Sequence, residues 1–121
     1  MKLKRVGFFK ELKHGDEFGT SLKEAVRNSP SENENKIIEY LNSGVAFCVS
    51  PGLVTDIIDE SKGVIGNLEI LTDGEWAWPS DLSYYVTFYH INLNSDFIEH
   101  IQKNGWTIPN KKYIDLLKLE L

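Results

Sequence analysis

The chain has 121 residues, of which 41% are hydrophobic and 26% are charged, and its net charge is −5. This length suits one domain, and this composition is that of a globular protein, which excludes a disordered chain. We therefore expect a single globular domain over residues 1–121. The only cysteine, Cys48, excludes an intrachain disulfide and a zinc site built from cysteines.

The sequence predicts a cytoplasmic protein with no membrane partner. Basic residues open the chain, but the apolar run that follows them is too short for a signal peptide and is interrupted by Lys10 and Glu11. No apolar stretch approaches the roughly 20 residues that a membrane helix needs.

The acidic residues are concentrated in one part of the chain. Residues 53–101 contain nine acids and one base, Lys62, and so carry −8, whereas the other residues contain 12 bases and 9 acids and carry +3. A negative field repels nucleic acid and steers cationic proteins toward it. We therefore expect no nucleic-acid partner. A cationic protein partner fits this charge, although solubility alone accounts for it equally well.

The N-terminal quarter predicts a strand and a short helix. Residues 2–9 are apolar enough for a strand, which Gly7 weakens. His14 lies in a turn signal and is expected to be exposed. The pattern Ser-Leu-Lys-Glu is a capping box, so a helix is expected over residues 21–28.

A second helix and a buried strand are predicted next. Another capping box with proline at the first helical position predicts a helix over residues 30–42, and Gly44 is expected to close it in the left-handed conformation. Residues 45–50 are apolar and β-branched, which favours a buried strand. Cys48 is then interpreted as a small buried hydrophobic residue and not as a nucleophile.

The most informative stretch is a hairpin predicted over residues 67–78. Asp73-Gly74 is a strong signal for a type I′ turn, which needs positive φ at both positions. Trp76 and Trp78 are two residues apart, so both side chains lie on the same face of the second strand.

Two more helices follow the hairpin. Ser80 is expected to cap a largely apolar helix over residues 81–90, and Asn94 to cap one that ends before Gly105. Residues 113–121 fit either a strand or a helix, and we favour the strand. Strands and helices without regular alternation predict an α+β fold, with a small, mainly antiparallel sheet and helices packed on one face.

No residue is predicted to be catalytic, to bind a cofactor or to bind a metal. The chain contains no nucleotide-binding loop and no nucleophile elbow. Asp73 and Glu75 could form an acid/base pair, but the turn and an exposed strand position explain them better. His90 and His100 do not have the spacing of a ligand pair, and a metal site needs three or four ligands. We therefore do not expect an enzyme.

What remains is a group of aromatic and acidic residues in and after the hairpin. Tyrosine and tryptophan dominate binding hot spots because they offer large contact area at a small entropic cost. About half of these aromatics should belong to the core, and the rest should form an exposed surface with an acidic rim. The predicted partner-binding residues are Asp73, Glu75, Trp76, Trp78, Asp81, Tyr84 and Tyr85.

The same part of the chain carries a family resemblance. The run LTDGEWAWPSDLSYYV, followed by YHINL, FIEHI and GW, resembles small bacterial immunity proteins that accompany polymorphic toxins, including those of contact-dependent growth inhibition systems. The matching residues are Thr72–Trp78, Pro79, Leu82, Tyr84–Val86, Tyr89, His90, Phe97 and Trp106. No residue before Leu53 carries the resemblance, and it transfers no site residues.

The resemblance implies an inhibitor that neutralises a cognate toxin protein in the cytoplasm of the producing cell. Such toxins are often basic nucleases, which an acidic surface would bind by charge complementarity. Two alternatives stay open: a small-ligand-binding protein or enzyme that uses an aromatic cleft, and a regulatory or structural subunit with a non-toxin partner. The oligomeric state is left open.

Overall fold

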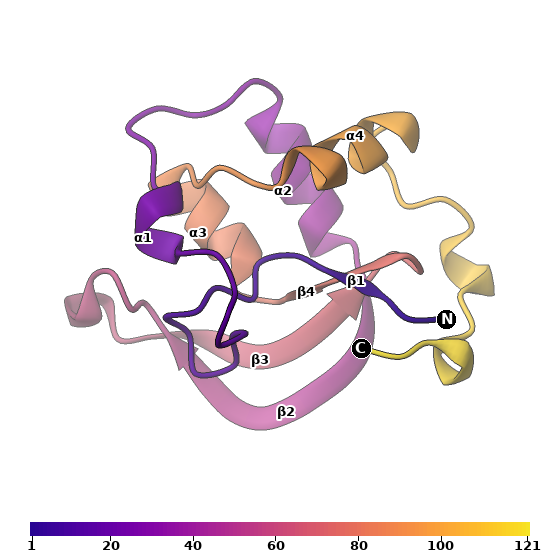
Figure 1. Cartoon of the computed structure of the whole chain (residues 1–121), viewed down its shortest axis with the longest axis horizontal. Coiled ribbons are helices and arrows are strands. Elements are labelled where there is room, and N and C mark those ends of the chain that lie inside the picture. The colour runs from indigo at the N-terminus through magenta and orange to yellow at the C-terminus, as the bar shows by residue number, and fades with distance from the viewer.

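A four-stranded sheet with four helices on one side forms the protein in its computed structural model, which describes residues 1–121 (Figure 1). The strands are β1 (Lys4–Arg5), β2 (Val45–Thr55), β3 (Val64–Thr72) and β4 (Trp76–Pro79). The helices are α1 (Leu22–Ala25), α2 (Glu34–Asn42), α3 (Leu82–Tyr89) and α4 (Ser95–Lys103). Three short 3₁₀ turns are η1 (Glu60–Lys62), η2 (Lys111–Tyr113) and η3 (Leu116–Lys118).

The predicted α+β class is confirmed, and the sheet is mixed. The strand order is β1-β4-β3-β2, with β4, β3 and β2 antiparallel and β1 parallel to β4. The helices cover one face, and segments near the two chain ends pack on the other, where Leu3 and Phe8 meet Ile70 and Ala77. None of the helices combines the length and the apolar character needed to span a bilayer.

The core lies between β4 and the helices and is built from aromatic rings. Trp76 and Trp78 share the helix-facing side of β4, as predicted, and their ring centroids lie 5.0 and 5.7 Å from that of Phe97 on α4. Tyr40 on α2 lies 6.0 Å from Trp78. The indole nitrogen of Trp78 donates to the carbonyl of Leu41 at 3.1 Å. Burial of large rings of this kind is the main source of stability in a small domain.

The predicted hairpin forms, but the predicted type I′ turn is wrong. Gly74 has a φ of +100°, whereas Asp73 does not have positive φ. The Asp73 carboxylate closes the turn instead, because its Oδ1 accepts from the amides of Glu75 at 2.9 Å and Trp76 at 2.8 Å. A side chain that satisfies two turn amides replaces the backbone geometry that the dipeptide suggested.

Two predictions around the start of β2 are wrong. Gly44 does not adopt positive φ. The position needs a glycine for lack of space, because a Cβ there would lie 2.8 Å from the Trp78 ring and 2.9 Å from Leu71. Cys48 lies in a strand as predicted, but it is exposed, because β2 is the edge of the sheet and is not covered on both faces. The strand also continues through Pro51 as an irregularity in its pairing with β3.

Two predicted helix caps also differ from the structure. Helix α2 begins at Glu34, and the Glu34 carboxylate accepts from the amide of Ser31 at 3.3 Å, so the cap is formed later in the chain than predicted. The hydroxyl of Ser80 does not cap α3, because it accepts from the amide of Glu69 and donates to the carbonyl of Asn67 in β3. In contrast, Ser21 and Asn94 cap α1 and α4 as expected.

The two ends of the chain are less regular than predicted. Only Lys4–Arg5 of the predicted first strand pairs with β4, because Gly7, with a φ of +82°, ends the regular strand. The favoured C-terminal strand is also wrong, since that segment forms η2 and η3 and makes a single bridge between Lys2 and Glu120. This bridge brings the two termini together, as Figure 1 shows.

The contact between Gly44 and Trp78 yields a stability prediction. Gly44→Ala should destabilise the protein by about 1–3 kcal/mol, because the added methyl group overpacks the core at the tryptophan. Gly66→Ala is the matched control, since its Cβ would lie 4.0 Å from Val54, and it should change stability by less than about 0.5 kcal/mol. Urea unfolding measures both; equal effects would contradict this account of Gly44.

Candidate functional site

The structure does not form the predicted acidic-aromatic surface. Five of its seven residues are buried, namely Asp73, Trp76, Trp78, Asp81 and Tyr85. Glu75 is exposed and Tyr84 is partly exposed. The prediction of an exposed surface is therefore wrong for most of these side chains, because the fold uses them to connect its own elements.

Asp73 is the centre of one such connection. Its Oδ2 accepts from the hydroxyl of Tyr40 on α2 at 2.5 Å and lies 2.7 Å from Nε2 of His100 on α4. The side-chain amide of Asn104 donates to the same tyrosine hydroxyl at 3.2 Å. The other nitrogen of His100, Nδ1, lies 3.4 Å from the Glu75 carboxylate. Burial and the hydrogen bond to Asp73 raise the pKa of Tyr40 above its usual range.

Asp56 is the centre of a second connection. This carboxylate is fully buried, and its Oδ2 accepts from the hydroxyls of Tyr84 at 2.7 Å and Tyr89 at 2.6 Å. Its Oδ1 accepts from the amides of Ile58 and Asp59. Burial opposes ionisation of Asp56, but these hydrogen bonds outweigh it and lower its pKa.

The predicted site residues Tyr84 and Tyr85 therefore hold the β2–β3 loop against α3. Tyr85 accepts from the amide of Ile57 and donates to the carbonyl of Thr55. Burial and the hydrogen bond to Asp56 raise the pKa of Tyr84 to about 12, and burial raises that of Tyr85 to about 12 despite the amide of Ile57.

Each of the three histidines lies against a buried carboxylate. His14 Nε2 is 2.9 Å from Asp81, and His90 Nδ1 is 2.9 Å from Glu34, in the same way that His100 faces Asp73. The expectation that His14 is an exposed turn residue is wrong, since its side chain is 14% exposed. These pairs join separate elements, and no three His, Cys, Asp or Glu side chains converge to hold a metal ion.

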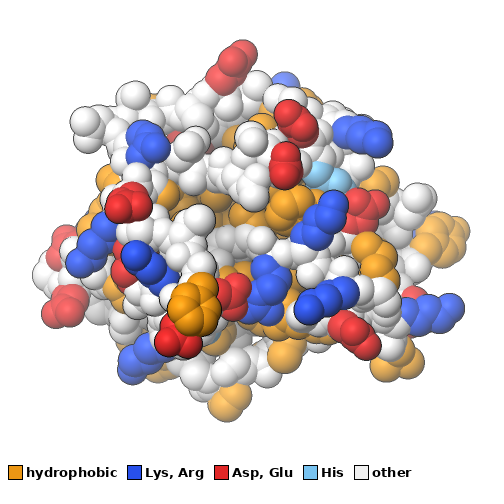
Figure 2. All heavy atoms as spheres, in the orientation of Figure 1, with side chains coloured by type: hydrophobic (Ala, Val, Ile, Leu, Met, Phe, Trp, Pro, Cys, Tyr) orange, Lys and Arg blue, Asp and Glu red, His pale blue; other side chains and the backbone are white.

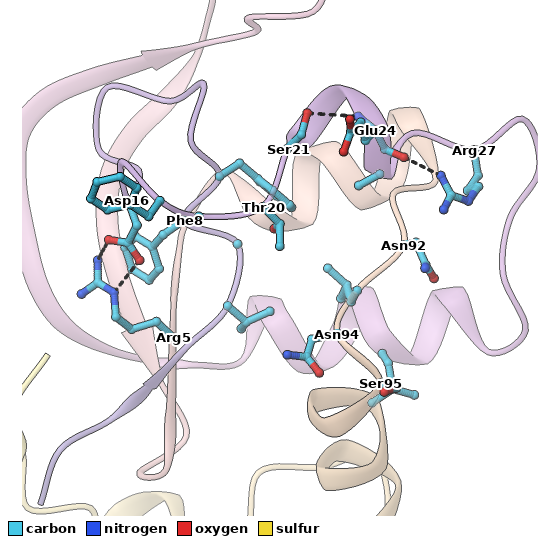
Figure 3. Close-up of a pocket in the computed structure, with 18 of the residues that line it drawn as sticks. Arg5, Phe8, Asp16, Thr20, Ser21, Glu24, Arg27, Asn92, Asn94 and Ser95 are labelled. Atoms are coloured by element: carbon cyan, nitrogen blue, oxygen red, sulfur yellow. Dashed lines mark hydrogen bonds and ion pairs between the residues drawn. The ribbon is translucent and has the colours of Figure 1, made fainter.

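A hollow in the surface lies elsewhere, as a groove of about 850 Å³ between the N-terminal segment, α1 and the start of α4. Figure 3 shows its three sides: Arg5, Phe8 and Asp16 on one, Ser21 and Glu24 of the α1 region on the next, and Asn92, Asn94 and Ser95 facing them. Its apolar lining includes Val6, Ala25, Leu93 and Ile98. We call this hollow the N-terminal groove.

An ion pair shapes the first side of the N-terminal groove. Arg5 Nη2 and Nε donate to the two oxygens of Asp16 at 2.7 and 3.0 Å, the paired geometry that arginine and a carboxylate favour. The guanidinium also lies over the ring of Phe8, 4.0 Å from its centroid. Residues 16–20 are therefore held beside β1 although they belong to no helix or strand.

Glu11 fixes the second side, at α1. Its carboxylate accepts from the hydroxyl of Ser21 at 2.7 Å and from the amides of Leu22 and Lys23 at 2.8 and 3.0 Å. Partial burial of Glu11 opposes ionisation, but the hydrogen bonds from Lys23, Ser21 and Leu22 together outweigh it and lower its pKa from 4.5 to about 2. A helix of four residues needs this support because it has few internal hydrogen bonds.

The third side is tied to α1 through the backbone. The amide of Asn92 donates to the carbonyl of Ala25 at 2.8 Å, and the amide of Arg27 donates to the carbonyl of Tyr89 at 3.1 Å. The Arg27 guanidinium donates only to nearby backbone carbonyls, those of Glu24 and Val26. Its charge is therefore not neutralised by an acid of the chain.

Phe18 stands at the edge of the N-terminal groove with 95% of its surface exposed. Charged side chains of both signs also line the groove: Asp16, Glu24 and Glu99 as acids, Arg5 and Arg27 as bases. The arrangement can bind a partner through an apolar contact and charged groups together. Sequence patterns missed it because Phe18 lies in the polar run HGDEFGT and the groove joins residues far apart in the chain.

Comparison with protein-family models, with curated proteins and with solved structures finds no match to this chain.

The hydrogen bonds to Glu11 yield a pH prediction. Because its pKa is lowered from 4.5 to about 2, Glu11 stabilises the fold above pH 4.5, and this contribution is lost as the pH falls toward 2. Glu11→Gln should therefore lower the free energy of unfolding by about 1–2 kcal/mol at pH 7, and the difference from wild type should shrink on acidification.

Glu17→Gln serves as the control because Glu17 is exposed and makes no side-chain hydrogen bond or ion pair. Urea unfolding at pH 7, 4.5 and 3 measures both variants. A Glu11→Gln effect that stays constant over this range would show that the carboxylate charge does not support α1.

Proposed function

We propose that this protein is a protein-binding inhibitor of the immunity type, which neutralises a cognate toxin in the cytoplasm through the N-terminal groove and Phe18. The proposed class comes from the resemblance of residues 72–106 to small bacterial immunity proteins. The observation that carries the choice of surface is Phe18, a large apolar side chain that is 95% exposed at the edge of this groove.

An exposed phenylalanine at this position supports contact with a protein. Burying such a ring contributes about 1.5–3 kcal/mol, and binding hot spots are commonly large side chains next to a pocket. The apolar lining of the groove offers a place for a side chain of the partner, while the charged residues around it form a polar rim. A hydrophobic centre with a polar rim is the usual anatomy of a protein interface.

The charges around the groove allow a cationic partner. Arg5 neutralises Asp16, whereas Glu24 and Glu99 form no ion pair within the chain. Arg27 partly offsets these two acids. Figure 2 shows acidic and basic side chains interspersed over the displayed face.

The structure has no aromatic cleft of the kind that the small-ligand alternative requires. The rings of Trp76, Trp78 and Phe97 pack against one another in the core and leave no site between them. A small ligand would have to use the N-terminal groove. The experiment below separates this alternative from the proposal because it measures neutralisation of a protein.

Growth rescue tests the proposal. A toxin domain encoded immediately upstream is expressed alone, with this protein, or with its Phe18→Asp variant. Wild type should restore growth, and Phe18→Asp should reduce both rescue and affinity, the latter by at least about 2 kcal/mol as for a hot-spot residue. Affinity is measured by calorimetry with the purified, inactivated toxin domain.

Leu117→Asp is the matched control, because Leu117 is 97% exposed and lies in η3, away from the groove. It should rescue growth as wild type does. If wild type neither rescues growth nor binds the toxin domain, the immunity-type function is wrong. If Phe18→Asp binds as tightly as wild type, the function survives and the groove is not the docking surface.

A further inference from the structure

The two ends of the chain form one region of the surface. The N-terminal amine of Met1 donates to the carbonyl of Lys118 at 2.6 Å, and the amide of Glu120 donates to the carbonyl of Met1 at 2.9 Å. Figure 1 shows the two termini close together, beside the short turns η2 and η3. Side chains from residues 1–4 and 110–121 are therefore presented together, although they lie at opposite ends of the sequence.

These two segments carry the opposite charge from the rest of the protein. They contain five lysines and two acids, or +3, which leaves 8 of the 13 bases and 16 of the 18 acids, or −8, for the other 105 residues. All five lysines are exposed. Of the two acids, Asp115 caps η3 and lies 3.9 Å from Lys118. This end of an acidic protein is therefore complementary to an anionic partner.

The C-terminal segment is anchored by one set of apolar residues and exposes another. Ile114 packs at the β3–β4 turn, and Leu119 and Leu121 pack on the small apolar cluster on the far face of the sheet. Tyr113 and Leu117 face away from the protein, at 73% and 97% exposure. The fold therefore does not account for these two large side chains.

The exposed apolar side chains lie among the lysines. Lys112 Nζ is 5.3 Å from the centroid of the Tyr113 ring, and Lys111, Lys112 and Tyr113 line a hollow with Val45. Figure 2 shows hydrophobic and basic side chains next to one another at the right-hand edge, where Figure 1 places the C-terminal segment. We call this surface the basic end, which consists of Lys2, Lys111, Lys112, Tyr113, Leu117 and Lys118.

We propose that the basic end docks on an anionic lipid surface, with Tyr113 and Leu117 inserted between the headgroups and the lysines beside the headgroup phosphates. Lysines near an anionic bilayer are attracted to it, and their apolar stems can lie along the lipid while the charge stays in water. Tyrosine favours the boundary between the acyl chains and water. The sequence predicted no membrane partner because the chain has no spanning segment, but docking on the surface requires none.

The exposure of Leu117 favours lipid over an acidic protein as the partner. A protein would have to supply a fitted pocket for a projecting leucine, whereas a fluid lipid surface closes around it. The two exposed apolar residues also lie on turns of three residues each, which offer no flat face for another protein. The acidic remainder of the chain is screened from the lipid beyond about 8 Å at physiological salt. The N-terminal groove is a different surface, so the inference does not rest on the proposed function.

Cosedimentation with lipid vesicles tests the inference. The full chain is mixed with vesicles of phosphatidylcholine alone or with about 30% phosphatidylserine, at about 0.15 M salt. We expect at least about tenfold stronger partitioning into the anionic vesicles, since each lysine near such a surface strengthens binding about fivefold. Lys111→Glu combined with Lys112→Glu should weaken it at least about tenfold. Leu117→Ser should weaken it at least about fivefold, because an inserted side chain is lost.

Two matched controls separate the basic end from general effects of charge and hydrophobicity. Lys10→Glu combined with Lys13→Glu changes the net charge equally, and both lysines are exposed and form no ion pair. Leu53→Ser removes another exposed leucine, one that is 63% exposed on β2. Both controls should bind anionic vesicles within about twofold of wild type. Circular dichroism establishes that every variant is folded.

Three results would overturn the inference. The first is a wild-type chain that binds neither kind of vesicle or binds both equally. The second is equal weakening by the two double lysine variants. The third uses poly-L-glutamate as an acidic polypeptide: binding to it as tight as to anionic vesicles, and unchanged by Leu117→Ser, would indicate an acidic protein as the partner. None of these results bears on growth rescue through the N-terminal groove.

Discussion

The fold depends on one buried carboxylate, that of Asp73. It closes the β3–β4 turn by accepting from two backbone amides, and it accepts from Tyr40 on α2 and faces His100 on α4. A buried carboxylate is stable only when its hydrogen-bonding capacity is filled, so the hairpin tip and two helices must be in place together. The ring cluster of Trp76, Trp78 and Phe97 lies directly beneath this junction.

The same principle explains why the most conspicuous stretch of the sequence is not a binding surface. Asp56 accepts hydrogen bonds from two tyrosines of α3, Tyr84 and Tyr89, and Asp81 is buried beside His14, so acids and aromatics that could have faced a partner lie against one another inside the protein. The exposed features that could bind a partner lie instead in a loop and in an irregular edge strand. Phe18 lies in a loop held by Arg5 and Asp16, and β2 is an edge strand whose outer side has no partner.

Local patterns predicted the elements well where local forces decide them. The caps at Ser21 and Asn94, the hairpin, the shared face of Trp76 and Trp78 and the end of α4 before Gly105 follow from short-range chemistry. Contacts between distant segments decided the rest. Gly44 is required by the Trp78 ring, Cys48 is exposed because β2 is an edge, and Glu11 supports a helix that begins eleven residues away. The groove could not be predicted from the sequence, because its sides come from three segments that only the tertiary fold brings together.

The most direct test of the central claim is a double-mutant cycle between Tyr40→Phe and His100→Gln, measured by urea unfolding at pH 7. The two residues lie on different helices and share the Asp73 carboxylate, so removal of one should change the effect of removing the other. The account predicts a coupling free energy of at least about 1 kcal/mol. Additive effects, within about 0.3 kcal/mol, would contradict the claim that Asp73 joins the hairpin and both helices into one unit.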